Sequence, residues 1–471
     1  MEVNVSKSLI DEIIQEQKES LIKLSHQIWS LSEVSMKEYK SSQLLKKFLK
    51  KEGFHIQENI ASLKTGFVAT FGISSPCIAF LGEYDALPEL SQVSSKPEKE
   101  SRKDSLSGHG CGHNLLGVGA LGAAIALKEV VSRKGVGCVK FFGCPGEEKG
   151  SGKAFMSKEG CFDDVDIALT WHPSDSNAVL NYQTLANLSY SFYFEGVSSH
   201  AAVAPHLGRS ALDAVELMNV GSNYLREHVL DDVRFHYAIV NSGGYAPNIV
   251  QANSEVLYYI RAPRVKEAKY VAERIEKIAQ GAALMTDTVV KVAMNEGVSE
   301  YIPNPVINRV LYDEFRDSKG PVFSTNEFDL GKNFYDTLSN EVHENSNQQL
   351  EAFYQIDMSN DIIVEKIAPL LDKVLILPAS TDVGDVSQVV PTGQITVSCA
   401  AKGTPLHSWQ YTAQADSVIG YKGMLKASEV LAKTGLRFLE DSKLIDEAEA
   451  CHNINYNCPI PSDVFPKYEE D

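Results

Sequence analysis

The sequence predicts an α/β protein in which a mixed sheet, covered by helices, is interrupted by a separate α+β unit. Three observations predict this class. Short β-rich apolar runs alternate with helical stretches in residues 1–186, and the same pattern returns over residues 299–471. Residues 187–298 follow a different order of strands and helices. A chain of 471 residues also has the length of two or three domains.

The first part of the chain begins with two predicted helices, over residues 8–31 and 36–52, where apolar residues recur at helical spacing. Three buried strands then run into polar loops, at residues 77–85, 138–148 and 165–173. A helix of small residues begins near Asn114, between the first two strands. Strands that alternate with helices in this way form a parallel or mixed sheet.

The middle part, residues 187–298, has the order strand, helix, strand, strand, helix, strand. The predicted strands are 187–196, 235–244, 255–263 and 287–297, and the helices are 210–228 and 265–286. This βαββαβ order predicts a ferredoxin-like α+β unit with an antiparallel sheet.

The last part returns to the first pattern, with predicted strands at 373–380 and 394–404 and a long closing helix over 416–441. The polar segment 317–350 is predicted as an insertion or a loose helical excursion. Residues 451–471, which contain several prolines, are predicted to form an extended strap on the surface.

Charge and hydropathy exclude two classes of partner. The 44 lysines and arginines stand against 62 aspartates and glutamates, a net charge of −18, and no basic run stands out. We expect no nucleic acid partner, because nucleic acids are bound by clustered basic residues. No apolar run approaches the ~20 residues that span a bilayer, and the charged N-terminus lacks a signal-peptide pattern. We therefore expect no membrane partner.

The spacing of the cysteines indicates the cellular compartment of the protein. The eight cysteines are scattered singly along the chain, without a C-x-x-C pair. In a chain of this size such cysteines are usually reduced thiols and not a disulfide framework. We therefore expect a cytoplasmic protein.

Side chains that can bind a metal or move a proton follow nearly every predicted strand, where ligands of open α/β sheets gather. These residues are Asp85, Cys111, His113, Glu147, Glu148, His172, Asp382, Asp385 and His407. Each alone is more often structural, but thiolate, imidazole and carboxylate together suit Zn²⁺, with Mn²⁺ or Co²⁺ as substitutes. The set predicts a metal-dependent hydrolase. In the Glu147–Glu148 pair, one carboxylate would bind metal and the other would take a proton.

Eight ordered motifs carry a resemblance to a known family. They are GEYDALPEL, GHGCGHNLLG, GCPGEEKGSGKAFM, ALTWHP, HAAVAPHLGRSALDA, NSGGYAPNIVQA, STDVGDVSQVVPT and GTPLHSWQ. The chain resembles the amidohydrolase branch of the aminoacylase and glutamate-carboxypeptidase family of metallopeptidases. The resemblance implies a di-metal, aminopeptidase-like catalytic domain at residues 1–186 and 299–471. Residues 187–298 would then be the inserted lid or dimerisation domain.

The resemblance also implies a pair of divalent metal ions per chain, zinc or manganese. Cys111 would lie between the two ions, and the other ligands would be His113, Glu148, His172 and His407. Glu147 would be the general base, and Asp85 would orient a ligand. The dipeptidase branches have a metal-binding histidine at the position of Glu83, so that role is not carried over to Glu83.

Further roles are implied for residues around the centre. His200 resembles a residue that family members send across a dimer interface to the partner's active site. Asn248 and Arg261 resemble the groups that hold the carbonyl and carboxylate of the substrate. Arg209 is a candidate substrate-binding residue, for which a purely structural role is weighed equally. His109 and His206 are expected to support the site without binding metal. A helix N-terminus is expected to lower the pKa of Cys111.

The function that the resemblance implies is hydrolysis of the amide bond of N-acyl amino acids, above all p-aminobenzoyl-glutamate. Three alternatives stay open: a dipeptidase for β-alanyl or γ-aminobutyryl dipeptides, a non-catalytic component of a heteromeric amidohydrolase, and a protein with a purely structural metal. The partners are a small-molecule substrate and either a second copy of the chain, in a homodimer, or a paralogous A-type subunit, in a heteromer.

Overall fold

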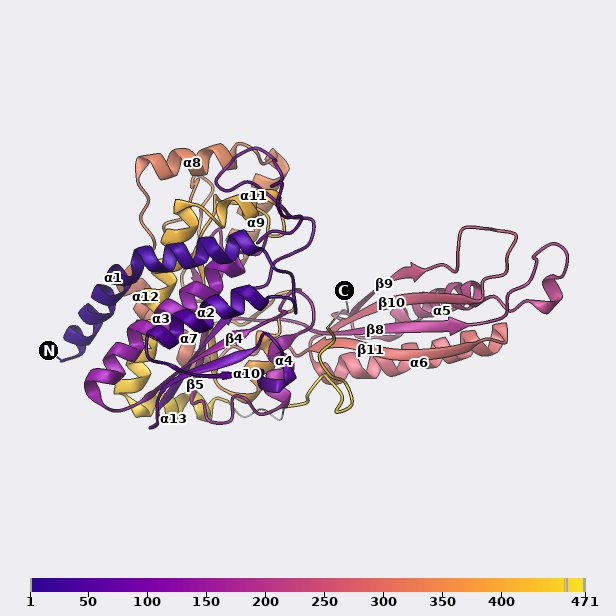
Figure 1. The fold of residues 1–471 in the computed structure, drawn as a ribbon, viewed down its shortest axis with the longest axis horizontal. Helices are drawn as coiled ribbons and strands as arrows, with labels where there is room; N and C mark the ends of the chain where they lie inside the picture. Colours follow the sequence, from indigo (N-terminus) through magenta and orange to yellow (C-terminus); the bar gives the residue numbers. More distant parts are fainter. Residues whose placement is uncertain (1, 453, 455, 469–471) are drawn as a thin grey trace.

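The computed structural model describes residues 2–452, 454 and 456–468, and Figure 1 shows two parts. A helix-covered main body holds one large sheet, and a narrower part with a second sheet projects from it. The two parts have separate hydrophobic cores.

The sheet of the main body has seven strands in the order β1-β2-β4-β3-β5-β13-β6. These are β1 (His55–Glu58), β2 (Phe67–Gly72), β3 (Cys77–Glu83), β4 (Cys138–Cys144), β5 (Ile167–Ser174), β6 (Ala178–Val179) and β13 (Thr392–Ser398). The four central strands, β4, β3, β5 and β13, are parallel, and the outer strands are antiparallel to their neighbours. The predicted mixed sheet is therefore confirmed.

Helices cover both faces of this sheet. The helices of the main body are α1 (Glu2–Leu31), α2 (Tyr39–Lys51), α3 (His113–Lys134), α4 (Gly152–Lys158), α7 (Pro305–Ser318), α8 (Thr325–Tyr335), α9 (Asn340–Tyr354), α10 (Val383–Val389), α11 (Trp409–Gln414), α12 (Val418–Glu440) and α13 (Ser442–Ala450). A one-turn 3-10 helix, η1 (Ile60–Ser62), also belongs to the main body, whereas η2 (Pro205–Leu207) and η3 (Arg226–His228) lie in the projecting part. The long helices α1, α3 and α12 contact one another, and their buried side chains share one core with the sheet.

The small residues of α3 allow it to lie closely under the sheet. A Cβ on Gly117 would lie 2.3 Å from the carbonyl oxygen of Glu83, and one on Gly119 would lie 2.6 Å from the ring of Trp171. By length and composition α3 could cross a membrane, so the expectation that no apolar run approaches that length was wrong. In this fold 83% of the most apolar 18-residue stretch of α3 is buried, as in the core helix of a globular domain.

The projecting part is built by residues 186–298. Its elements are β8 (Ala186–Glu195), α5 (Ala211–Leu225), β9 (Arg234–Asn241), β10 (Asn253–Ala262), α6 (Val265–Thr286) and β11 (Val289–Val298). The strand order is β11-β8-β10-β9, and all pairs are antiparallel. Both helices pack on the sheet through one apolar core. The βαββαβ element order matches the sequence pattern, and β9 is an edge strand.

Two segments differ from their predicted form. Residues 373–380 contain only the short strand β12 (Leu375–Ile376), which pairs with β7 (Tyr182–Gln183) outside the large sheet. The prediction of a main-sheet strand there was wrong, because this apolar run lies on the surface with partly exposed side chains. The polar segment 317–350 forms the ordered helices α8 and α9, whose N-termini are capped by Ser324 and Ser339.

The tail after α13 forms no helix or strand in its described residues and ties the two parts together. The hydroxyl of Tyr468 accepts a hydrogen bond from the backbone of Lys64 in the main body, at 2.6 Å. Lys467 donates to Asn295 of β11 at 3.0 Å, and the carbonyl of Cys458 accepts from Lys269 of α6 at 2.7 Å. The tail is thus a strap, as the sequence predicts.

Candidate active site

The predicted site residues of the main body meet at the carboxyl edge of the four parallel strands. Asp85 follows β3, Glu147 and Glu148 follow β4, His172 lies near the end of β5, and His407 follows β13. The first residues of α3 lie in the same region, since Cys111 Sγ is 3.4 Å from His172 Nε2. The topology therefore gathers donors from segments far apart in the sequence.

A glycine turn positions Cys111. Gly112, the residue before α3, has φ +79°, and a Cβ there would lie 3.1 Å from both Pro173 and Tyr411. Only glycine combines that backbone conformation with that close approach. The loop that carries His407 contacts this turn, because the backbone N–H of His407 donates to the carbonyl of Gly110 at 2.8 Å.

Asp85 fixes the imidazole of His113. Its Oδ1 accepts a hydrogen bond from Nδ1 of His113 at 2.8 Å, and its Oδ2 accepts from Ser35 and from the backbone N–H of Glu148. Both side chains are 0% exposed. The Nε2 atom of His113 therefore faces the centre of the cluster, which is the role of an orienting carboxylate beside a metal-binding histidine.

Glu147 and Glu148 occupy different surroundings, although they are adjacent. Oε1 of Glu148 lies 3.3 Å from Nε2 of His407. Glu147 lies 4.0 Å from Nε2 of His113, and its side chain is 15% exposed. Burial raises the pKa of Glu147 well above its usual range, and the nearby Glu83 and Asp382 raise it further. Glu147 is therefore a carboxylate with a raised proton affinity beside the donor cluster.

The donor atoms fall into three groups, each within 4.8 Å: Cys111 with His113 and His172, Cys111 with Glu148 and His407, and Glu83 with His113 and Glu147. Two donors bound to one ion at about 2.0–2.3 Å, with angles of roughly 90–110°, lie about 2.8–3.8 Å apart. The contacts of 3.4 Å for Cys111–His172 and 3.3 Å for Glu148–His407 have this spacing.

Unsatisfied polar atoms support the same interpretation. Nε2 of His113, Oε1 of Glu148 and Oε2 of Glu83 are buried and have no hydrogen-bond partner among the described residues. Buried polar atoms are normally paired, so three orphans at one point require an explanation. Divalent cations explain them, and the thiol, imidazoles and carboxylates are donors that such cations accept. The residues present thus fit a metal centre.

The electrostatics of Cys111 differ from expectation. Burial raises the pKa of its thiol, and Glu148 and Glu147 raise it further, whereas His113 opposes them. The expectation that a helix N-terminus lowers this pKa was wrong for the protein without metal, because removal of the thiol from water outweighs the helix end. A cation must therefore displace the proton when Cys111 binds it.

The candidates of residues 187–298 do not join the cluster. His200, Arg209 and Asn248 lie in connected loops: Ala201 bonds the carbonyl of Asn248, and the backbone of Arg209 pairs with that of Val197. These loops lie at the end of the projecting sheet that points away from the main body, after β8 and between β9 and β10 (Figure 1). The Arg209 side chain is held by Asp287, at 2.7 Å.

Arg261 lies at the other end of the projecting sheet. Its Nη1 donates to the hydroxyl of Ser380 in the main body at 2.7 Å. Glu296 of β11 accepts from the backbone of Gly150, two residues after Glu148, at 2.7 Å. Arg261 is thus close to the junction of the two parts.

The two supporting histidines are also accounted for. His109 is 1% exposed and lies 3.2 Å from the carbonyl of Ile28, and burial lowers its pKa to about 3. It therefore braces the turn without joining the donor groups. His206 is an exposed residue of η2 in the projecting part.

Sequence reasoning missed a buried charge cluster beside the centre. Lys153 contacts Glu83 Oε1 at 2.8 Å and pairs with Asp382, and the side chains of Lys153 and Asp382 are 0% exposed. Asp385 instead accepts from Ser299. The available signal was a carboxylate at the last position of the otherwise uncharged strand CIAFLGE.

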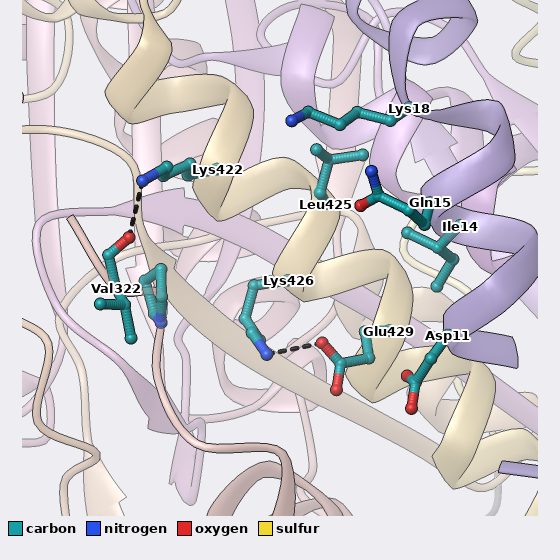
Figure 2. Close-up of a pocket in the computed structure, with 10 residues that line it drawn as sticks. Asp11, Ile14, Gln15, Lys18, Val322, Lys422, Leu425, Lys426 and Glu429 are labelled. Carbon is teal, nitrogen blue, oxygen red and sulfur yellow. Dashed lines mark hydrogen bonds and ion pairs between the residues drawn. The ribbon is translucent and has the colours of Figure 1, made fainter. Parts of the chain in front are cut away.

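A cavity of about 360 Å³ lies apart from this cluster, between α1, α12 and residues 321–322. Figure 2 shows two of its lysines engaged: Lys426 pairs with Glu429, and Lys422 donates to the carbonyl of Val322. The residues predicted for catalysis are not among those that line it.

Known sequences similar to this chain include one family and several individual proteins. The family described as peptidase family M20/M25/M40 matches residues 79–318. The B-type subunit of the p-aminobenzoyl-glutamate hydrolase of Escherichia coli (strain K12) is 42% identical over 470 residues, 97% of this chain and 98% of that protein. The Xaa-Arg dipeptidase of Mus musculus is 29% identical over 460 residues, 94% of this chain and 91% of that protein.

Among solved structures, the YXEP protein of Bacillus subtilis is described as a dinuclear metal binding peptidase from the M20 family. It matches with a TM-score of 0.56 at 15% identity, over 90% of this chain and 99% of that chain. At this identity the likeness concerns the fold, and it confirms the predicted α/β class with its central mixed sheet.

Proposed function

The chain belongs to peptidase family M20/M25/M40 and is a metal-dependent amidohydrolase that acts on N-acyl amino acids; on this premise we propose that its substrate is p-aminobenzoyl-glutamate. The observation that carries the proposal is the 42% identity to the B-type component of the E. coli p-aminobenzoyl-glutamate hydrolase, which extends over 97% of the chain. The reaction cleaves the amide bond between the aromatic acyl group and glutamate.

Five side chains would hold two divalent cations, zinc or manganese. Cys111, His113 and His172 form one donor group, and Cys111, Glu148 and His407 form the other, so that Cys111 is shared. The bound cations would polarise the amide carbonyl and make water more acidic. Asp85 supports this arrangement by fixing the tautomer of His113.

Glu147 would act as the general base. It would take a proton from the attacking water and later give it to the leaving amine of glutamate. The burial that raises its pKa supports this role, because a carboxylate with higher proton affinity both accepts and returns a proton more readily near neutral pH.

Three polar side chains of the projecting part would complete the site, with Arg209 held as a fourth candidate. Arg261 would bind the carboxylate of the substrate, for which its planar guanidinium is suited. Its position beside Ser380 supports this role. His200 would stabilise the developing oxyanion and Asn248 would hold the carbonyl. Because both lie in loops remote from the donor cluster, they would act in a partner's active site.

The partner would be a second copy of this chain or a paralogous chain, bound through residues 187–298. Apolar side chains exposed on the edge strand β9 (Tyr237, Ile239, Val240) and on α5 (Leu217, Val220, Tyr224) support an interface there. An unpaired edge strand with apolar side chains is otherwise a site of uncontrolled association. We place the protein in the cytoplasm, which agrees with its eight free cysteines.

The test is release of p-aminobenzoate from p-aminobenzoyl-glutamate by the purified chain with Zn²⁺ or Mn²⁺ added. We expect turnover by the wild type and a loss of about 10²–10⁴-fold in Glu147→Gln, because the general base is removed while its volume is kept. Metal content, measured in parallel, is expected to be unchanged in the variant.

The 29% identity to an Xaa-Arg dipeptidase favours a second candidate, a dipeptidase. Turnover of an Xaa-Arg dipeptide with none of p-aminobenzoyl-glutamate would replace the proposed substrate. Turnover of neither by a metal-loaded chain, restored by a paralogous chain, would assign this protein an incomplete site. A chain that binds no divalent metal would contradict the proposal.

A further inference from the structure

We propose that Glu83 is an additional metal ligand that binds through Oε2, while Lys153 and Asp382 hold its other oxygen in place. The inference rests on the metal centre of the proposed function and adds a carboxylate to it. Glu83 is the last residue of β3, and its side chain is 3% exposed. Together with His113 and Glu147 it forms the third donor group of the cluster.

The distance from Glu83 to His113 is that of two ligands on one ion. Oε2 of Glu83 lies 3.2 Å from Nε2 of His113. This spacing resembles the 3.4 Å and 3.3 Å of the other two close donor pairs, and it falls within the roughly 2.8–3.8 Å expected for atoms that share an ion. Glu83 and His113 therefore fit a cation as well as the other pairs do.

A hydrogen bond does not explain this contact. Although the two atoms are 3.2 Å apart, neither has a hydrogen-bond partner among the described residues. The Nδ1 proton of His113 is donated to Asp85, so Nε2 is the ring atom that remains to bind a cation. A cation that both Nε2 of His113 and Oε2 of Glu83 bind would satisfy both orphans.

Lys153 determines which oxygen of Glu83 is available. Its Nζ lies 2.8 Å from Oε1 of Glu83 and also binds Oδ1 of Asp382. Asp382 in addition accepts the backbone N–H of Lys153 at 2.9 Å. A lysine and a carboxylate that are both 0% exposed stay paired, because separation would leave a buried charge alone. Glu83 is thus a ligand with one free oxygen and a fixed direction.

The chemical consequence is a second carboxylate in the ligand set. With Glu83, the ion held by His113 receives a hard oxygen in addition to imidazole and thiolate. Carboxylate ligands suit Mn²⁺ better than sulfur ligands do. Glu83 thereby widens the range of divalent ions that the centre accepts.

The test measures metal content in the wild type and two variants after dialysis against a chelator, followed by titration with Mn²⁺. Glu83→Gln removes one charge and keeps the volume. Asp382→Asn is the matched control, because it removes an equal charge from the same lysine but Asp382 is not among the donors of the three groups. We expect the apparent affinity for one ion to fall by about tenfold or more in Glu83→Gln and by clearly less in Asp382→Asn, which loosens the support of Glu83 but removes no donor atom.

Two outcomes would overturn the proposal: wild-type metal affinity in Glu83→Gln, or an equal loss in both variants, which would mean that Glu83 acts only through the Lys153 pair. A wild type that binds no metal would instead contradict the proposed function. Should Glu83→Gln fail to fold, anomalous diffraction from Mn²⁺-loaded wild-type crystals decides. An ion about 2.0–2.3 Å from Glu83 Oε2 supports the proposal, and an ion out of bonding reach overturns it.

Discussion

Asp385 lies fully buried under the active-site edge of the sheet. It accepts hydrogen bonds from the backbone and hydroxyl of Ser299 and from the hydroxyl of Tyr456. Burial nonetheless raises its pKa from 3.8 to about 7. The folded protein therefore holds a proton on Asp385 over a pH range in which the unfolded chain has released it.

This shift makes stability depend on pH, and the sign follows from proton linkage. Between pH 3.8 and about 7 the folded state binds more protons than the unfolded chain does. The contribution of Asp385 to the free energy of unfolding therefore falls as the pH rises through that window. We expect Asp385→Asn to gain up to about 4 kcal/mol relative to the wild type on going from acid to neutral pH, at 1.36 kcal/mol per unit. Urea unfolding across this window measures the difference. Parallel profiles for wild type and variant would contradict it.

At the scale of single residues, the sequence predicted candidate donors that follow strands, but it did not predict the pairing of Glu83 with Lys153. Cys111, His113 and His407 each come directly after or before a recognisable element. Glu83 and Lys153 are 70 positions apart, and only the folded sheet brings their side chains to 2.8 Å. Charge pairing of this kind leaves no periodic pattern in the chain.

Elements were predicted well where one face or a whole strand is apolar. The parallel strands β3, β4, β5 and β13 lie within or close to their predicted ranges, because buried parallel strands are continuous apolar runs. The same criterion failed for β12, an apolar run on the surface. It also missed β1, a short polar strand at the edge of the sheet, and β2, the largely apolar strand beside it.

The contact between α3 and β3 gives a prediction at the scale of elements. A Cβ on Gly117 would lie 2.3 Å from the backbone oxygen of Glu83, whereas a Cβ on Gly281 of α6 would meet nothing within 4 Å. We expect Gly117→Ala to destabilise the protein by about 1–3 kcal/mol and to weaken metal binding, because α3 must move away from β3. Gly281→Ala is expected to stabilise it by about 0.5–1 kcal/mol.

Thermal unfolding and metal titration of the two glycine variants test this expectation. Both changes add one methyl group to the inside of a helix, so helix propensity alone predicts stabilisation in both. If Gly117→Ala were as stable as Gly281→Ala and kept its metal, the close approach of α3 would not control the site.

At the scale of the whole molecule, the shape separates two sets of functional candidates. The donor cluster is in the main body, whereas His200 and Asn248 belong to loops at the far end of the projecting sheet (Figure 1). Within one chain the tail strap joins the two parts near the junction, through contacts such as Lys467–Asn295. The proposed role of His200 therefore requires a partner.

Mixing two inactive variants tests this requirement. Glu147→Gln lacks the base, and His200→Ala lacks the proposed oxyanion group. In a mixed dimer, the chain with intact Glu147 receives His200 from its partner, so one of two sites is complete. Random pairing of equal amounts is expected to restore about a quarter of wild-type activity in a symmetric dimer. No restoration after confirmed exchange of chains would mean that His200 acts within its own chain or not at all.

The order of the proposed donors along the chain determines the order in which they are synthesised. Cys111, His113, Glu148 and His172 are synthesised early, but His407 comes after β13, the last strand to enter the large sheet. A growing chain therefore offers only part of the cluster to a metal ion. With the five proposed ligands, a complete metal centre can form only after β13 and His407 have been synthesised.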